Sequence, residues 1–188
     1  MSEIPIPNDV HRVPADAERI NLFTAADVAS ILKEKNWLAG EANEIQAAWC
    51  ARAATFLGPQ VADRAALADL LGLIFEYDAQ ALLQATESHA VMSRYAARDA
   101  LRQLALLLLD GAPLTSERFS DILMHLKQAL DIRGRELFHP LRLALAGRAG
   151  GGELDRVILL LDEAAAAGFA VPPKTARERI LEFCSALD

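Results

Sequence analysis

The chain has 188 residues, of which 53% are hydrophobic and 24% are charged, and alanine and leucine together occupy 66 positions. Aromatic residues make up only 6% of the chain and β-branched residues are few, which argues against a β-sandwich. The net charge of −7 argues against broad, nonspecific binding to a nucleic-acid backbone.

The first 22 residues hold three of the eight prolines and show no helical period, so we expect residues 1–22 to form an extended lead. From Thr24 onward the pattern is helical. Thr24 and Asp27 have the spacing of a capping box, which predicts a helix that begins there and ends near Trp37.

A second helix is predicted from about Glu41 to Leu57. Gly58 permits a left-handed cap at its end, and Pro59 prevents the helix from continuing. A third helix begins near Asp63, and a shorter one follows Tyr77-Asp78 and runs through Ala85. The third helix carries apolar residues at three- and four-residue spacing: Leu67, Leu70, Leu71 and Ile74.

Residues 88–109 predict one long helix that ends at Gly111 and Pro113. Pro140 is expected in or near the first turn of a later helix, where its missing N–H costs little. The remaining helices are expected over residues 115–134, 136–146, 153–167 and 175–187, the last of them with Thr175 and Glu178 as a capping box and the Gly150–Gly152 run as a break before residue 153.

These elements predict an all-α fold, a compact helical bundle or cage of eight or nine helices with short connections. We divide it into an N-terminal lead at residues 1–22, a first helical subdomain at residues 23–110 and a second at residues 111–188.

Two cysteines, Cys50 and Cys184, form no disulfide framework and lie in apolar helical surroundings, so buried thiols and a cytoplasmic location are expected. The N-terminus lacks the features of a signal peptide, and no apolar run is long enough to span a membrane. We expect no metal and no cofactor, because the four histidines show no metal-ligand spacing and no phosphate-binding or nucleophile motif is present: His11, His89, His125 and His139.

The negative charge is unevenly distributed. Residues 1–93 carry 6 basic and 13 acidic side chains, whereas residues 94–188 carry 13 of each. Most basic residues of the second half are arginines, which suit hydrogen bonding to phosphates and base edges. From charge alone, ordinary solvated helix faces are the favoured explanation.

The most informative segment is Arg133–Arg148. Its apolar residues are too numerous for an exposed helix, so Arg142 starts from a largely buried helix and must find a partner or a solvent-facing edge. One interpretation is a core helix whose arginines reach the surface. The other is a nucleotide-binding element, in which arginines and the glycine-rich turn provide hydrogen-bond donors.

The run Arg-Gly-Arg-Glu-Leu-Phe-His-Pro-Leu-Arg-Leu-Ala-Leu-Ala-Gly at residues 133–147, followed by Gly-Gly-Glu-Leu at 151–154, resembles the C-terminal anticodon-binding region of bacterial glutamyl-tRNA synthetase. Weaker similarity extends over roughly residues 24–161, including Ile74-Phe-Glu-Tyr-Asp78 and Leu114-Thr-Ser-Glu117. The resemblance implies a helical cage that binds the anticodon of the glutamate tRNA.

By position, the resemblance implies that the anticodon contacts are Arg142, Gly151, Gly152 and Leu154. From their charge and proximity in sequence we add Arg133, Arg135 and Arg148 as candidate phosphate contacts. The chain departs from the family pattern at Ala146, where threonine is usual, and at Gly150–Gly152, where a proline is common, so the turn is looser.

The sequence contains no His-x-Gly-His segment, no Lys-Met-Ser-Lys-Ser loop and no alternating β/α pattern, so we expect that this chain does not activate glutamate by itself. The expected function is recognition of the glutamate tRNA, with a separate catalytic-domain protein as a possible second partner that the acidic first half could face, and with no DNA or membrane partner. The alternatives are a helical domain that now serves protein–protein interaction, and an enzyme whose site the sequence does not reveal.

Overall fold

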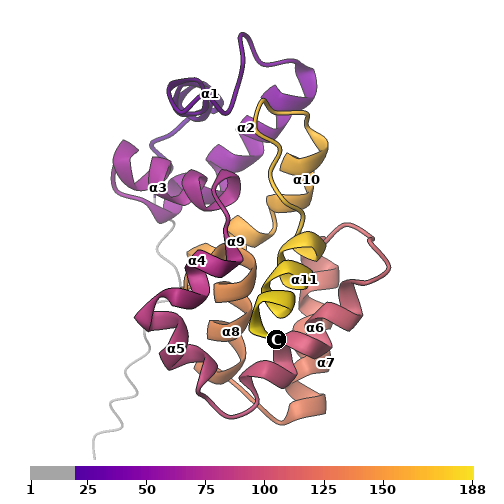
Figure 1. Cartoon of the computed structure of the whole chain (residues 1–188). Coiled ribbons are helices and arrows are strands. Elements are labelled where there is room, and N and C mark those ends of the chain that lie inside the picture. The colour runs from indigo at the N-terminus through magenta and orange to yellow at the C-terminus, as the bar shows by residue number, and fades with distance from the viewer. Residues whose placement is uncertain (1–19) are drawn as a thin grey trace, which may run out of the picture.

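A computed structural model describes residues 20–188, and every regular element in that range is helical (Figure 1). The all-α prediction is confirmed. The extended lead predicted for residues 1–22 lies almost entirely outside the described residues. The described elements are α1 (Ala25–Glu34), α2 (Glu44–Leu57), the 3-10 turn η1 (Gly58–Gln60), α3 (Arg64–Phe75), α4 (Ala79–Gln84), α5 (Thr86–Met92), α6 (Ala97–Leu108), α7 (Ser116–Leu130), α8 (Arg135–Ala146), α9 (Glu153–Ile158), α10 (Leu161–Ala166) and α11 (Ala176–Leu187).

Residues 20–188 form eleven α-helices instead of eight or nine, because two predicted helices are each broken in two. The helix expected over residues 88–109 is interrupted by a turn at 93–96, where Ala96 has a left-handed φ of 60°. The helix expected over residues 153–167 is interrupted at Leu159 and Leu160, and the indole N–H of Trp49 donates to the Leu160 carbonyl at 3.2 Å.

The helix caps follow the sequence closely. The capping boxes predicted at Thr24 and at Thr175 are both present. The role predicted for Gly58 is wrong: its φ is −52°, within the right-handed region. A side chain at position 58 would collide with Asn21, whose amide donates to the Ala54 carbonyl at 3.0 Å. Glycine is therefore needed there for close approach and not for a left-handed cap.

Pro140 also differs from its prediction. It is the sixth residue of α8 and lies inside the helix, not in its first turn. A residue at that position would normally donate its N–H to the carbonyl of Glu136, so α8 lacks one internal hydrogen bond. Pro140 is buried, so its ring contributes to packing.

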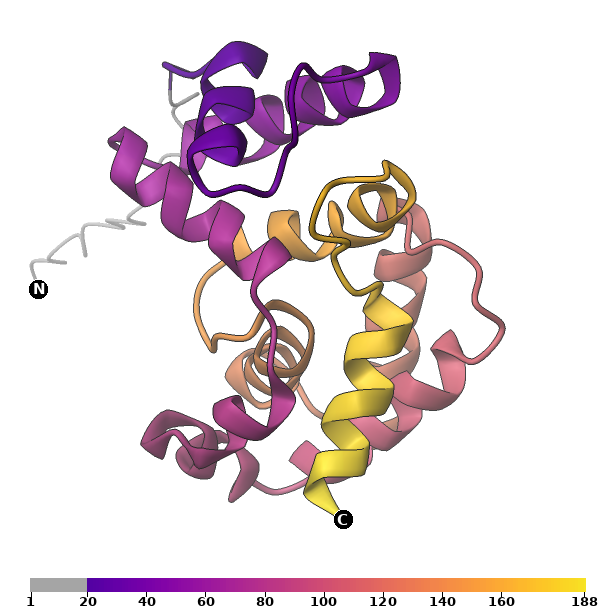
Figure 2. The ribbon, with the colours of Figure 1, turned by 45° about the horizontal axis from the view of Figure 1, so that its top comes forward.

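The helices form two groups that meet at α9 (Figures 1 and 2). At one end, α1 packs on α2, and α9 and α10 pack against α2. At the other end, α8 packs against α5 and α6, α7 packs against α6, and α11 contacts α4, α6 and α8. The contacts of α9 with α2, α3 and α8 join the groups. The boundary predicted between residues 110 and 111 falls in the loop between α6 and α7, and the subdomain division stays a prediction.

Four aromatic rings form the centre of the first group. The rings of Trp37 and Phe75 stack with their centroids 4.8 Å apart. Trp49 and Phe169 meet edge to face at 5.1 Å, and each also packs edge to face on Phe75. Because Phe169 follows α10 in sequence, these contacts hold the end of α10 against α2 and α3.

Arg179 of α11 is fully buried at the junction of the two groups. One of its terminal nitrogens donates to the carbonyls of Leu73 and Leu145, both at 2.8 Å, and the other donates to the carbonyl of Ile74. These carbonyls lie in the last turns of α3 and α8, which carry partial negative charge. The guanidinium also lies 4.5 Å from the centroid of the Tyr77 ring. Arg179 therefore joins three helices without a carboxylate partner among its hydrogen bonds.

Candidate nucleic-acid interface

Helix α8 positions most of the predicted site. It begins after Gly134, whose φ of 55° and ψ of −131° suit only glycine, and it ends at Gly147 in the left-handed conformation. Arg135, His139 and Arg142 follow at four- and three-residue spacing, which places them on one face of the helix. The buried residues of α8 include Leu137, Leu141, Leu143, Ala144 and Leu145.

This face of α8 borders an open cavity of about 410 Å³. The glycine-rich turn that follows α8 forms another part of its wall. The lining includes two arginines, a histidine, an aromatic ring and exposed backbone, which together can bind a polar, planar ligand with negative charge. The residues concerned are Arg135, Phe138, His139, Arg142, Gly150 and Gly151.

Arg142 forms an ion pair with Asp155, which confirms the prediction that it needs a partner or a solvent-facing edge. Its Nε donates to Oδ1 of Asp155 at 2.8 Å, and its Nη2 donates to Oδ2 at 2.7 Å. Its Nη1 donates to the Gly150 carbonyl at 2.7 Å, and its guanidinium lies 4.7 Å from the centroid of the Phe138 ring. Of its five N–H groups, two remain without a partner among the described residues.

Arg94, in the turn between α5 and α6, contacts α8 from 41 to 45 residues earlier in the chain. Its Nη1 donates to Nδ1 of His139 at 3.1 Å and to the Arg135 carbonyl at 3.4 Å. Because arginine can only donate, His139 carries its proton on Nε2. Burial, followed by the positive charges of Arg94, Arg135 and Arg142, lowers the pKa of His139 below its usual 6.5.

We expect the Arg94→Ala substitution to raise the pKa of His139, because it removes a positive charge and a donor that favours the neutral ring. A titration of the His139 ring signals by NMR would measure the change. Arg102→Ala, which alters an exposed arginine of α6, is the matched control and should leave the His139 titration unchanged. An unaltered pKa in the Arg94→Ala protein would contradict the arrangement.

The residues of the glycine-rich turn and of the helix after it differ in exposure and in hydrogen bonding. The Gly151 N–H donates to Oε1 of Glu153 at 3.2 Å, whereas a side chain at Gly152 would enter open space. Gly151 and Gly152 are both exposed. The Leu154 side chain is only 1% exposed, so it packs in the core and offers no surface to a ligand.

The two remaining predicted arginines lie apart from this cavity. Arg133 is exposed and borders a neighbouring cavity of about 260 Å³ between α7 and α8. Arg148 lies beyond the other end of α8 and pairs with Asp69 of α3 through contacts of 2.8 and 3.2 Å. Hydrogen bonding to Arg148 lowers the pKa of Asp69. Because α8 has twelve residues, about 18 Å of helix separates Arg148 from Arg135.

Sequence reasoning missed two polar residues at this place. The one signal for His139 was its spacing from Arg135 and Arg142 on a common helix face. Nothing in the sequence indicated Arg94, because the turn that carries it falls within a predicted continuous helix.

The part of the chain that the structure describes contains no group of three or more His, Cys, Asp or Glu side chains able to hold a metal. None of its helices is both long and apolar enough to cross a membrane.

Comparisons with known proteins agree with the sequence pattern. A family model for an anticodon binding domain matches residues 25–166. Glutamate–tRNA ligase 2 of Syntrophus aciditrophicus (strain SB) is 29% identical over 129 residues, which cover 65% of this chain and 25% of the relative. Glutamate–tRNA ligase 2 of Coxiella burnetii (strain RSA 331 / Henzerling II) is 42% identical over 43 residues, 23% of this chain and 9% of the relative. The matched regions thus span a quarter or less of these relatives' lengths. No solved structure matches the chain.

Proposed function

This chain belongs to the anticodon-binding domain family related to glutamate–tRNA ligase, and from that premise we propose that it binds the anticodon loop of the glutamate tRNA. The observation that supports this most directly is the cavity beside α8. It lies within the matched residues and combines Arg135, His139 and Arg142 with the exposed glycine turn. The proposed role of these residues is recognition of the tRNA and not the chemistry of aminoacylation.

Arg142 is suited to contact a base rather than a phosphate. Its bidentate pair with Asp155 offsets its charge and fixes the plane of the guanidinium. The two N–H groups left over can donate to the edge of an unstacked base. The Phe138 ring packs against the face of the guanidinium. The exposed backbone of Gly151 borders the same cavity, and the exposed Gly152 follows it in the turn.

Arg133 and Arg135 are suited to contact phosphates. Both are exposed, and neither forms an ion pair in the described structure, so their charges remain available. Of residues 1–93, α5 packs against α8 and carries one acid, Glu87. A ligand bound at these two positions would avoid most of the excess acid of residues 1–93 if α1–α3 faced away from the RNA. The surface formed by the acidic half would then be the one available to a catalytic-domain partner.

Binding of the glutamate tRNA is expected to be saturable and to weaken as salt rises, with log K falling by about 0.7–0.9 for each log unit of salt per phosphate contacted. Fluorescence anisotropy with a labelled transcript at several salt concentrations would measure both. Replacing Arg133 and Arg135 together by alanine should reduce this slope by about 1.4–1.8, because two phosphate contacts are lost.

The matched control is Arg64→Ala, which removes an exposed arginine of α3 and should leave the slope as it is. Equal affinity for unrelated tRNAs, or an absence of binding at low salt, would overturn the proposed specificity for the glutamate tRNA.

A further inference from the structure

We propose that Tyr95 is a base-stacking residue of the same RNA site, contributed by the turn between α5 and α6. It would stack on an unpaired nucleobase next to the nucleotide bound by Arg135 and Arg142. This inference rests on the proposed function and adds to the site a residue from the turn between α5 and α6.

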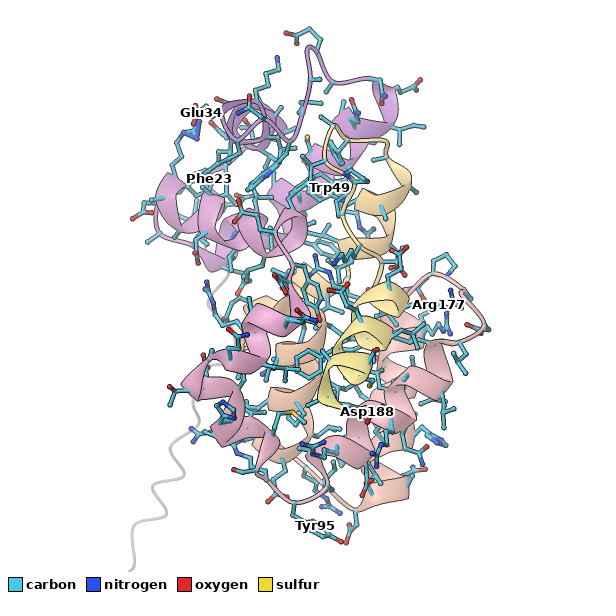
Figure 3. The ribbon with its side chains drawn as sticks, viewed as in Figure 1. Phe23, Glu34, Trp49, Tyr95, Arg177 and Asp188 are labelled. Atoms are coloured by element: carbon cyan, nitrogen blue, oxygen red, sulfur yellow. The ribbon has the colours of Figure 1, made fainter. Side chains whose placement is uncertain are left out.

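The first argument is the exposure of Tyr95. Its side chain is 85% exposed, the largest value among the exposed large hydrophobic residues of the described chain. Figure 3 shows it extending from one end of the molecule, away from the helices. The next residue, Ala96, has a φ of 60°, a conformation that residues other than glycine rarely adopt. The chain thus turns sharply at the point where it presents an aromatic ring to solvent.

The second argument is the attachment of this turn to α8. Tyr95 directly follows Arg94, so their Cα atoms are about 3.8 Å apart. Arg94 donates to His139 at 3.1 Å and to the Arg135 carbonyl at 3.4 Å, and both acceptors belong to residues that line the cavity. The side chain of Arg94 therefore bridges the cavity wall to the backbone that carries Tyr95.

The third argument is the chemistry of the surroundings. Proteins bind unpaired bases by combining aromatic faces with arginines. Tyr95 directly follows Arg94, whose side chain contacts His139 and the Arg135 carbonyl at the cavity. At the cavity itself, the charges that act on His139 are those of three arginines, Arg94, Arg135 and Arg142, and of one acid, Glu87 of α5. Ser93 in the turn and Arg98 and Asp99 just after it are exposed polar residues. An isolated ring in polar surroundings favours a nucleobase over an apolar protein surface.

The test uses the full chain and a labelled anticodon stem-loop of the glutamate tRNA. Tyr95→Ala should raise Kd roughly 5- to 150-fold, the range expected for the loss of one base stack. Tyr95→Phe keeps the ring and should bind within about threefold of the unmodified protein. Because a stack contacts no phosphate, the salt dependence of Kd should be the same in both variants. A stem-loop carrying a photoreactive uridine should also crosslink to the peptide that contains Tyr95.

The outcomes separate this inference from the function on which it rests. If the unmodified chain binds no tRNA, the proposed function fails and the inference fails with it. If the unmodified chain binds, but Tyr95→Ala binds equally well or Tyr95→Phe loses as much as Tyr95→Ala, the stacking role alone is overturned. Since Tyr95 is so exposed, the alanine variant should retain its fold, which an unchanged thermal unfolding curve would verify.

Discussion

Replacing Arg179 by methionine is expected to lower the free energy of unfolding by about 3–5 kcal/mol. Methionine fills much of the same space but provides no donors. The carbonyls of Leu73, Ile74 and Leu145 would then be buried without partners, and each orphaned group costs about 1–3 kcal/mol. No carboxylate is hydrogen-bonded to the guanidinium, so the substitution breaks hydrogen bonds to carbonyls and no hydrogen-bonded ion pair. Burial lowers the pKa of Arg179 to about 10, still well above neutral pH.

Urea denaturation followed by circular dichroism would measure this loss. Arg177→Met is the matched control, because Arg177 belongs to the same helix and is exposed at the side of the molecule (Figure 3). Its unfolding free energy should change by less than about 0.5 kcal/mol. Equal midpoints for the two variants would show that the hydrogen bonds of Arg179 contribute little.

Replacing Arg142 by alanine is expected to weaken binding of the glutamate tRNA by about 1–3 kcal/mol, roughly 5- to 150-fold, if its free N–H groups read a base. The same substitution also breaks the pair with Asp155 and the bond to the Gly150 carbonyl. The binding measurement must therefore be made at a temperature where the variant is shown to be folded.

The Asp155→Asn variant distinguishes direct contact of Arg142 with a base from an effect of its pair with Asp155. This variant removes the carboxylate but keeps the arginine, whose donors become more available. We expect its tRNA affinity to stay within about threefold of the unmodified protein, a difference of under 1 kcal/mol. If both variants lost affinity equally, Arg142 would act through its pair with Asp155, and the role assigned to it from the family resemblance would be wrong.

The sequence predicted those features that depend on local interactions. Capping boxes at Thr24 and Thr175 were found because donor and acceptor lie three residues apart. The break between α5 and α6 was missed because it coincides with a contact from Arg94 to His139, 45 residues away. The break between α9 and α10 coincides with a bond from Trp49 to Leu160, over 111 residues. Such distant partners leave no periodic signal in a single sequence.

The candidate site shows the same limit. The apolar neighbours of Arg142 indicated that it needed a partner, but only the fold identifies Asp155 as that partner. The cluster of arginines in sequence also overstated their proximity, since Arg148 lies beyond the far end of α8 and pairs with α3. Arg94 entered the site only through folding. Sequence proximity is a poor guide to shared surfaces once a helix of three turns intervenes.

Arg179 lies outside the residues that match the family model, although it is buried among them. The residues related to other anticodon-binding domains are 25–166, whereas Arg179 and the fully buried Ile180 and Phe183 belong to α11 beyond them. The carbonyls that end α3 and α8 inside the matched range are satisfied from outside it. The matched stretch is therefore shorter than the packed structure, and a fragment of residues 25–166 would leave the carbonyls of Leu73, Ile74 and Leu145 without the donors of Arg179.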